Sequence, residues 1–273
     1  MRLIETHIVG GLFLTILDEI IESTRKRVGE ESRLHPIEEM KLDSSERRSL
    51  RESINQGPEA AVIAEIKRMS PSSGDIRPDV DLVKVTGEMT RGGSVGISVL
   101  TEPDYFNGRL DFIPVVREAT HLPVLRKDFI VDKYQLYESA EAGADAVLLI
   151  TEVLGKSLPE FVKTSRELEI ECLVEVSNED QVELAIQCAP DLIGINNRDL
   201  KSMKIDPSRT ERLAKLIPDE VTVVSESGIN EAADVKRMLE DGADAVLVGT
   251  SIMKSKDIEG KVRRLTGVGE SNG

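Results

Sequence analysis

The sequence predicts an α/β protein in which a (β/α)8 barrel follows an N-terminal helical extension. Three observations support this fold class. Short β-branched runs alternate with longer amphipathic stretches, eight such runs lie between residues 61 and 249, and the hexamer GADAVL occurs twice, at 143–148 and 242–247. We therefore expect one structural domain, in which an extension of residues 1–56 packs on a catalytic barrel of residues 57–273.

The extension is predicted to be helical. Apolar residues recur at helical spacing over residues 12–28 and leave one charged face. A second charged helix is expected over residues 45–55, with Ser44 or Ser45 as its cap and Gly57-Pro58 as its stop.

The barrel is predicted from eight short runs that are apolar on both faces, as parallel strands are. The gaps between them are long enough for crossover helices, and residues 132–143 and 178–188 fit that role. A doubly wound open sheet is the alternative, but it usually has fewer strands, and no Gly-rich dinucleotide motif follows the first run. The predicted strands are 61–66, 94–100, 122–127, 145–150, 172–176, 191–196, 221–226 and 244–249.

Composition excludes several classes of function. A net charge of -15 argues against nucleic acid or an anionic membrane as partner. Cys172 and Cys188 form no disulfide framework, and the three histidines lack ligand spacing, so we expect no metal site. No apolar run is long enough to span a membrane. Glu5 and His7 interrupt the apolar opening, which makes a poor signal peptide, so we expect a cytoplasmic protein.

Charged residues end several predicted strands, and in a barrel those ends meet at one mouth. Glu65 and Lys67 are two residues apart on the first strand and therefore share a face. Lys127 ends the third strand, and Glu175 lies within the apolar fifth strand, where an unpaired carboxylate would be costly to bury. Together these four residues indicate a functional site, with buried structural ion pairs as the alternative.

Three other acidic residues at strand ends are expected on the surface. They are Glu102, Asp128 and Glu152.

Two loops are suited to binding phosphate. Residues 225–229, SESGI, follow the seventh strand, and residues 249–251, GTS, follow the eighth, which is the usual phosphate site of this fold. The Ser70 hydroxyl and the Lys67 ammonium of the first loop could add to it. The residues alone thus predict a barrel enzyme that acts on a phosphorylated small molecule.

The motifs in these loops and strands resemble those of the indole-3-glycerol-phosphate synthase family. The resemblance runs from about residue 13 to the C-terminus and follows all eight strands in order. The motifs are IAEIKRMSPSSG (63–74), TEPDYFNG (101–108), VLRKDFIVD (124–132), GADAVLLI (143–150), LVEV (173–176), GINNRDL (194–200), SESGI (225–229) and LVGTSIM (247–253).

The resemblance implies a lyase of tryptophan biosynthesis that needs no cofactor. Its substrate would be 1-(2-carboxyphenylamino)-1-deoxyribulose 5-phosphate, which loses carbon dioxide and water as the ring closes to indole-3-glycerol phosphate. The family likeness also favours a monomer.

The resemblance also assigns roles to residues. Lys127 would protonate the substrate carbonyl, and Glu175 would take a proton from the ring or the anilino nitrogen. Lys67, with Glu65 beside it, would hold the carboxylate or phosphate side and serve in dehydration. We expect the neighbouring carboxylates and partial desolvation to set the pKa of the ammonium acid near the working pH.

The remaining assignments concern binding. Asn196 and Glu226 would bind substrate hydroxyls and orient the lysines, and Arg198 would support the carboxylate. Because the chain has no Trp, Phe13, Phe106 or Phe112 would supply an aromatic wall. The expected phosphate ligands are Lys67, Ser70, Ser227, Gly228, Gly249 and Thr250.

Three rival interpretations remain. A phosphoribosylanthranilate isomerase would use an Asp and a Cys in place of the lysine acids, which the pair Lys67 and Lys127 argues against. A flavin-binding barrel would use the same phosphate site and would be yellow. A barrel that has lost activity lacks support, since every expected charged residue is present.

Overall fold

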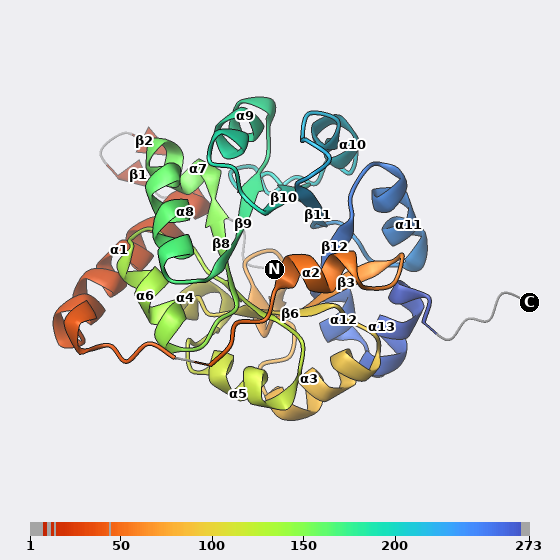
Figure 1. The fold of residues 1–273 in the computed structure, drawn as a ribbon, viewed down its shortest axis with the longest axis horizontal. Coiled ribbons are helices and arrows are strands. Elements are labelled where there is room, and N and C mark those ends of the chain that lie inside the picture. The colour runs from red at the N-terminus through yellow and green to blue at the C-terminus, as the bar shows by residue number, and fades with distance from the viewer. Residues whose placement is uncertain (1–7, 10–11, 14, 44, 269–273) are drawn as a thin grey trace, which may run out of the picture.

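Eight parallel strands form a closed barrel at the centre of the molecule, with helices around it (Figure 1). The computed structural model describes residues 8–9, 12–13, 15–43 and 45–268, so Glu5, His7 and the candidate cap Ser44 lie outside the described residues. The strands follow one another around the barrel in chain order, and the last pairs with the first. The predicted (β/α)8 barrel is confirmed, and the open doubly wound sheet is wrong.

The barrel strands agree with the predicted runs to within two residues at each end. In register, Leu100 lies beside Lys127 and Asn196 beside Glu226, which brings the carboxyl ends of neighbouring strands to one edge. The strands are β3 (Ala61–Ile66), β6 (Gly96–Leu100), β7 (Val124–Lys127), β8 (Ala146–Ile150), β9 (Glu171–Val176), β10 (Leu192–Asn196), β11 (Thr222–Glu226) and β12 (Ala245–Val248).

Helices connect successive strands and cover the outside of the barrel (Figure 1). The longer ones are α3 (Leu82–Arg91), α5 (Phe112–Ala119), α6 (Tyr134–Glu141), α8 (Leu158–Glu167), α9 (Glu179–Gln187), α10 (Arg209–Ala214), α11 (Ala232–Glu240) and α13 (Ile258–Thr266). Short elements at the mouth are β4 (Met69–Ser70), β5 (Gly74–Asp75), α4 (Pro103–Phe106), α7 (Thr151–Leu154), η2 (Gly155–Ser157) and α12 (Thr250–Lys254). Within the described residues, no helix is both long and apolar enough to cross a bilayer.

The first predicted helix exists but begins later than expected. Helix α1 spans Ile16–Leu34, whereas Leu12–Phe13 form a short strand, β2, paired with β1 (Ile8–Val9). Thr15 sets the start, because its hydroxyl accepts from the Asp18 N–H while the Asp18 carboxylate accepts from the Thr15 N–H. Pro36 follows the last turn and disfavours further helix.

The second predicted helix is shorter than expected because tertiary contacts hold its first residues in an extended path. Helix α2 spans Leu50–Asn55, capped by Ser49 rather than Ser45, and a turn, η1, lies at Ile37–Glu39. Arg48 precedes the cap, and its guanidinium donates to the carbonyls of Thr120 and Leu122 at 2.8 and 2.9 Å. Helical periodicity alone could not reveal those acceptors.

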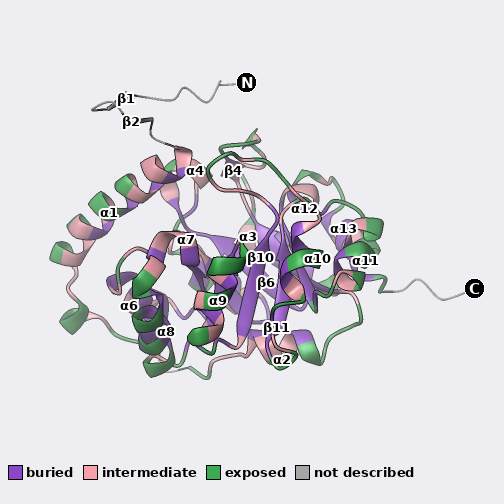
Figure 2. Ribbon diagram, turned by 90° about the horizontal axis from the view of Figure 1, so that it is seen from above, coloured by how far each residue is buried: buried purple, intermediate pink, exposed green. Residues whose placement is uncertain are grey.

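The two N-terminal helices lie at opposite ends of the barrel (Figure 2). Leu50 and Ile54 of α2 belong to the apolar cluster inside the barrel, together with Ala61 and Leu192 at strand starts. Leu17 and Ile20 of α1 belong to the same cluster at the other end. A second, larger cluster fills the layer between the strands and the outer helices. The extension therefore closes the barrel at its base and borders its mouth.

The repeated hexamer GADAVL forms the same joint twice, as the repeat predicted. Gly143 and Gly242 have φ of 81° and 102°, the left-handed region that favours glycine after a helix. Asp145 then accepts from the Val124 N–H at 2.8 Å, and Asp244 accepts from the Val223 N–H at 2.7 Å. Each aspartate thus ties the start of its strand to the preceding strand.

The two joints predict different costs for the same substitution. Asp145 is buried, accepts a second bond from the Arg48 N–H at 2.9 Å and pairs with Arg117, whereas Asp244 is exposed. We expect Asp145→Ala to lower the free energy of unfolding by about 3 kcal/mol, because the Val124 and Arg48 N–H groups lose their acceptor and Arg117 loses one of its two carboxylate partners. Asp244→Ala, the matched control, should lower it by about 1 kcal/mol. Urea unfolding measures both, and equal losses would contradict this account.

Candidate active site

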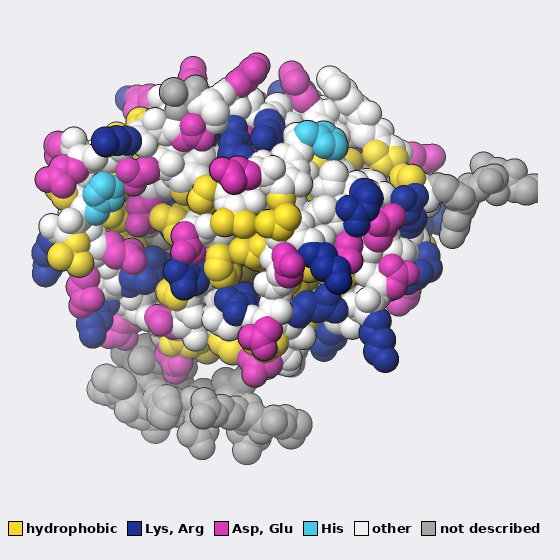
Figure 3. All heavy atoms as spheres, turned by 90° about the horizontal axis from the view of Figure 1, so that it is seen from below, with side chains coloured by type: hydrophobic (Ala, Val, Ile, Leu, Met, Phe, Trp, Pro, Cys, Tyr) yellow, Lys and Arg dark blue, Asp and Glu magenta, His cyan; other side chains and the backbone are white. Residues whose placement is uncertain are grey.

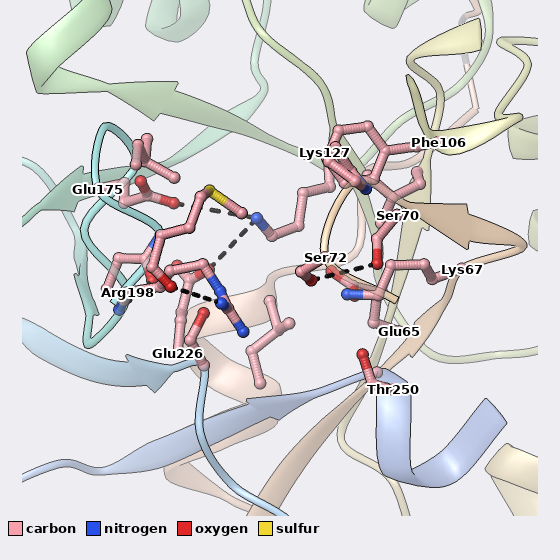
Figure 4. A pocket seen from close by; sticks show the side chains of 18 of the residues that line it. Glu65, Lys67, Ser70, Ser72, Phe106, Lys127, Glu175, Arg198, Glu226 and Thr250 are labelled. Atoms are coloured by element: carbon pink, nitrogen blue, oxygen red, sulfur yellow. Dashed lines mark hydrogen bonds and ion pairs between the residues drawn. The ribbon is translucent and has the colours of Figure 1, made fainter. Parts of the chain in front are cut away.

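A cavity of about 240 Å³ opens at the carboxyl ends of the barrel strands. The residues predicted from the sequence for catalysis and binding line it, apart from two of the three alternative aromatic residues, and Figure 4 shows the charged ones pointing into it. They are Glu65, Lys67, Ser70, Phe106, Lys127, Glu175, Asn196, Arg198, Glu226, Ser227, Gly228, Gly249 and Thr250.

The Lys127 ammonium lies between two buried carboxylates (Figure 4). Its Nζ is 3.4 Å from Glu226 Oε2 and 3.9 Å from Glu175 Oε2. These residues come from β7, β11 and β9, so the parallel arrangement of the barrel brings them together. The barrel thus holds two acidic side chains and one ammonium close together in a mostly buried position.

The pKa of Lys127 is shifted in the opposite direction from the one that we expected from the sequence. Burial of the ammonium lowers its pKa, but the charges of Glu226, Glu175 and Glu65 raise it more, so the pKa lies above the ordinary lysine value. The expectation that these carboxylates bring it towards the working pH is wrong. Lys127 is held as an ammonium, which can protonate a group more basic than an amine.

The two carboxylates have raised pKa values for a shared reason. Burial raises the pKa of Glu175, and the Lys127 charge opposes that effect without cancelling it. Burial likewise raises the pKa of Glu226 from 4.5 to about 7, since the repulsion from Glu175 and Glu65 adds to desolvation. A carboxylate with a raised pKa is a stronger base, which suits proton abstraction.

Two glycines leave space for carboxylate side chains that come from neighbouring strands. A Cβ on Gly194 of β10 would collide with Glu226 Oε1 on the neighbouring strand β11. A Cβ on Gly249, which follows β12, would collide with Glu65 Oε1 on the neighbouring strand β3. Glu65 in turn pairs with Lys67, whose Nζ is 2.5 Å from the same oxygen.

The cavity also carries hydroxyl groups near Lys67 and an unusual backbone turn after β11. Figure 4 shows Ser70 and Thr250 on the same side as Lys67. Ser227 and Gly228 have φ of 69° and 83°, and successive residues of this kind can turn backbone N–H groups towards an anion. Among the described residues, the N–H groups of Gly228 and Ile229 have no backbone acceptor.

The apolar side of the cavity contains residues that the sequence analysis missed. Phe129 lies beside Phe106, with ring centroids 6.1 Å apart. Helix α1 contributes one apolar face, and the loop after β10 contributes another, each distant in the chain from the strand ends. Of these residues, only Phe129 could have been found from the sequence, because it lies two residues after Lys127 at the end of a predicted strand. The missed apolar residues include Ile16, Leu17, Ile20, Phe129, Leu200, Met203 and Ile205.

Of the three candidate aromatic residues, Phe106 lines the cavity. Phe112 does not line it; its ring packs under the Arg68 guanidinium at 5.5 Å in a cation–π contact. The Phe13 side chain lies outside the described part of the structure.

The surface prediction for the other strand-end acids is wrong for Glu102 and Asp128. Both are buried: Glu102 accepts from three backbone N–H groups of α4, and Asp128 accepts from the Thr101 hydroxyl at 2.6 Å and from Arg126 at 3.0 Å. Glu152 is partly buried and pairs with Lys201 at 2.7 Å. Glu102 and Glu152 are not among the residues that line the cavity, whereas Asp128 lines it while bound to Thr101 and Arg126.

The outer surface carries charges of both signs. On the face in Figure 3, Lys and Arg are interspersed with Asp and Glu and form no basic patch. Within the described residues, no group of His, Cys, Asp and Glu could hold a metal ion. Cys172 and Cys188 are not among the residues that line the cavity.

Comparison with known proteins identifies one family. Residues 17–265 match the sequence model of the family described as "Indole-3-glycerol phosphate synthase". A protein of that name from Methanopyrus kandleri is 44% identical over 260 residues, which cover 93% of this chain and 99% of that protein. Another from Dehalococcoides mccartyi is 50% identical over 214 residues, or 77% and 83% of the two chains.

A solved structure shows the same fold at low identity. Thiamine phosphate pyrophosphorylase from Pyrococcus furiosus superposes with a TM-score of 0.60 and 15% identity, covering 81% of this chain and 98% of that chain.

Because the pKa of Glu226 is raised in the folded protein, we expect the stability of the protein to fall as the pH rises. The variant Glu226→Gln should lack this pH dependence. The unfolded chain releases this proton near pH 4.5 and the folded protein near pH 7, so the contribution is favourable below pH 4.5 and is lost as the pH rises towards 7. Urea unfolding should show the stability of the unmodified protein, relative to the variant, falling by about 3 kcal/mol across that window. A difference that does not change with pH would contradict it.

Proposed function

This chain belongs to the indole-3-glycerol phosphate synthase family, and on that basis we propose which of its residues carry the reaction. The enzyme converts 1-(2-carboxyphenylamino)-1-deoxyribulose 5-phosphate to indole-3-glycerol phosphate in tryptophan biosynthesis. An aromatic carbon attacks the ribulose carbonyl, carbon dioxide leaves, and loss of water completes the ring.

Lys127 is the acid that protonates the substrate carbonyl oxygen. As the aromatic carbon attacks, this oxygen becomes an alkoxide, which is more basic than an amine and can take a proton even from an ammonium whose pKa is raised. The pairing of Lys127 with Glu226 and Glu175 supports the role, because it holds the ammonium charged and aimed into the cavity. The single observation that carries the proposal is this buried cluster.

Glu175 is the base. Loss of carbon dioxide returns the electron pair of the broken C–C bond to the aromatic ring, so this step releases no proton. Glu175 accepts the proton that leaves the newly closed ring or its anilino nitrogen when water is lost and the new double bond forms. Its raised pKa supports the role. Asn196, whose Oδ1 accepts from the Arg198 N–H at 3.0 Å, turns its amide N–H groups to Glu175 and the cavity, and we assign it to the substrate hydroxyls together with Glu226.

Arg198 supports the substrate carboxylate from the loop after β10. Its guanidinium lines the cavity and donates to the Met203 carbonyl at 2.9 Å. Burial lowers the pKa of Arg198, yet the group stays charged, as arginine does in proteins. The opposite side of the cavity, with Lys67 and Glu65, serves in the dehydration step.

The phosphate binds on the side with hydroxyl groups and the unusual turn. The positive φ values of Ser227 and Gly228 and the nearby Lys67 ammonium support this assignment. The proposed ligands are Lys67, Ser70, Ser227, Gly228, Gly249 and Thr250.

The anthranilate ring binds against Phe106. Phe129 beside it and the apolar face of α1 complete a wall without tryptophan, which supports the assignment.

Other sequence-based expectations are also part of the proposal. Residues 1–56 form an extension of the barrel of residues 57–273, supported by the position of Leu50 and Ile54 in the barrel core. We also propose that the enzyme is monomeric and cytoplasmic, that it needs no cofactor, and that it binds neither nucleic acid nor membranes.

Lys127→Ala should abolish turnover, because it removes the proton donor for the carbonyl. Incubation of the purified protein with 1-(2-carboxyphenylamino)-1-deoxyribulose 5-phosphate, followed by indole fluorescence, measures the loss, which we expect to be at least about 100-fold in kcat. Lys201→Ala is the control, since Lys201 pairs with Glu152 and is largely exposed. Product formation by Lys127→Ala at the rate of the control would rule out Lys127 as the acid.

Glu175→Gln should lower kcat with little change in substrate affinity. The amide keeps the shape of the side chain but cannot accept the proton, so the loss belongs to the chemical step, about 100-fold or more. Steady-state kinetics with the same substrate test this. A normal kcat with a large rise in KM would mean that Glu175 binds substrate and is not the base.

A further inference from the structure

The turn at Ser227 and Gly228 needs a support that lies outside the cavity. Ser227 has a φ of 69°, a conformation that is unfavourable for a residue with a side chain. Such a backbone persists only where its surroundings hold it. The carbonyl of Ser227 accepts a hydrogen bond from Asn197 Nδ2 at 3.3 Å.

Asn197 belongs to a closed ring of hydrogen bonds with two hydroxyls. The Thr210 hydroxyl donates to Asn197 Oδ1 at 3.0 Å, and Asn197 Nδ2 donates to Ser225 Oγ at 3.0 Å. The Ser225 and Thr210 hydroxyls are 2.8 Å apart, so the Ser225 hydroxyl donates to Thr210 and closes the ring. All three side chains are buried, where hydrogen bonds in such a ring strengthen one another.

Only a carboxamide satisfies every partner at this position. Asn197 provides one acceptor, used by Thr210, and two donors, used by Ser225 and Ser227. A carboxylate of the same size has no donor, and an apolar side chain has neither. The second donor is therefore what connects the buried ring to the strained carbonyl.

The backbone of Asn197 is fixed as well. Its N–H donates to the Glu226 carbonyl at 2.9 Å, and its carbonyl accepts from the Asp206 N–H at 2.8 Å. The residue thus joins the end of β10, the end of β11 and the loop before α10. Although Asn196 and Arg198 line the cavity, Asn197 is not among its lining residues.

We propose that Asn197 is a positioning residue that holds Ser227 and Gly228 in the backbone conformation that receives the substrate phosphate. This inference rests on the proposed function, because it assumes that the phosphate binds at that turn. Asn197 does not line the cavity, and it contacts the Lys127 cluster only through its backbone N–H, which bonds to the Glu226 carbonyl. A change of its side chain keeps that backbone bond, so it should affect phosphate affinity and leave the chemical step intact.

The test compares Asn197→Asp with the unmodified enzyme. The variant keeps the size of the side chain and removes both donors, so we expect KM to rise about tenfold while kcat changes less than about twofold. Inorganic phosphate, used as a competitive inhibitor, should show the same tenfold loss of affinity. A role in stability alone would lower the melting temperature without moving the inhibition constant.

Thr210→Val provides a second variant in case Asn197→Asp does not fold. It removes the donor to Asn197 Oδ1 with little change of shape, and we expect a rise of about threefold in both KM and the phosphate inhibition constant. Thr210→Ser keeps the hydroxyl and should restore the values of the unmodified enzyme.

The outcomes separate this inference from the proposed phosphate site. If inorganic phosphate inhibits the unmodified enzyme competitively, but equally well in Asn197→Asp and Thr210→Val, the role of Asn197 is overturned and the phosphate site stands. If Ser227→Val leaves KM and phosphate inhibition unchanged, the phosphate does not bind at this turn, and both proposals fail.

Discussion

The site depends on one interaction, the contact of the Lys127 ammonium with the carboxylates of Glu226 and Glu175. Each of these carboxylates is almost completely buried, and an isolated ionised carboxylate in that position would be strongly unfavourable. The ammonium compensates them at 3.4 and 3.9 Å, and they in turn raise its pKa. The proposed acid and base therefore stabilise each other before any substrate arrives, which keeps these groups in place.

The surrounding structure fixes the geometry of this cluster without disturbing the packing of the strands. Gly194 and Gly249 supply space for carboxylates on neighbouring strands, so the acids fit without displacing a strand. Buried hydrogen-bonded groups support the same edge of the barrel, since Asn197 ties β10 to the turn after β11 and Asp128 binds Thr101 beside β7. The proposed reacting groups thus lie on strands, and the loops and α1 shape the rest of the cavity.

The sequence predicted the barrel and the polar half of the site because both follow from local rules. A buried parallel strand must be short, apolar and β-branched, so eight such runs indicated eight strands without any knowledge of contacts. Once the barrel is accepted, its carboxyl ends share one mouth, and the residues that end the strands, such as Glu65, Lys127 and Glu226, are placed together by topology. The motif resemblance then added the reaction, which spacing alone could not supply.

Tertiary structure decided what depends on partners distant in the chain. The start of α2 is displaced because Arg48 binds carbonyls of Thr120 and Leu122. Asp128 is buried rather than exposed, and its carboxylate accepts from the hydroxyl of Thr101 on the neighbouring strand end. The apolar wall from α1 and the raised pKa of Lys127 arise only when separate elements meet. A strand is determined by the periodicity of a few neighbouring residues, so the sequence is enough to predict it. Burial, pKa values and cavity shape depend on distances between atoms that lie far apart in the chain, so only the tertiary structure decides them.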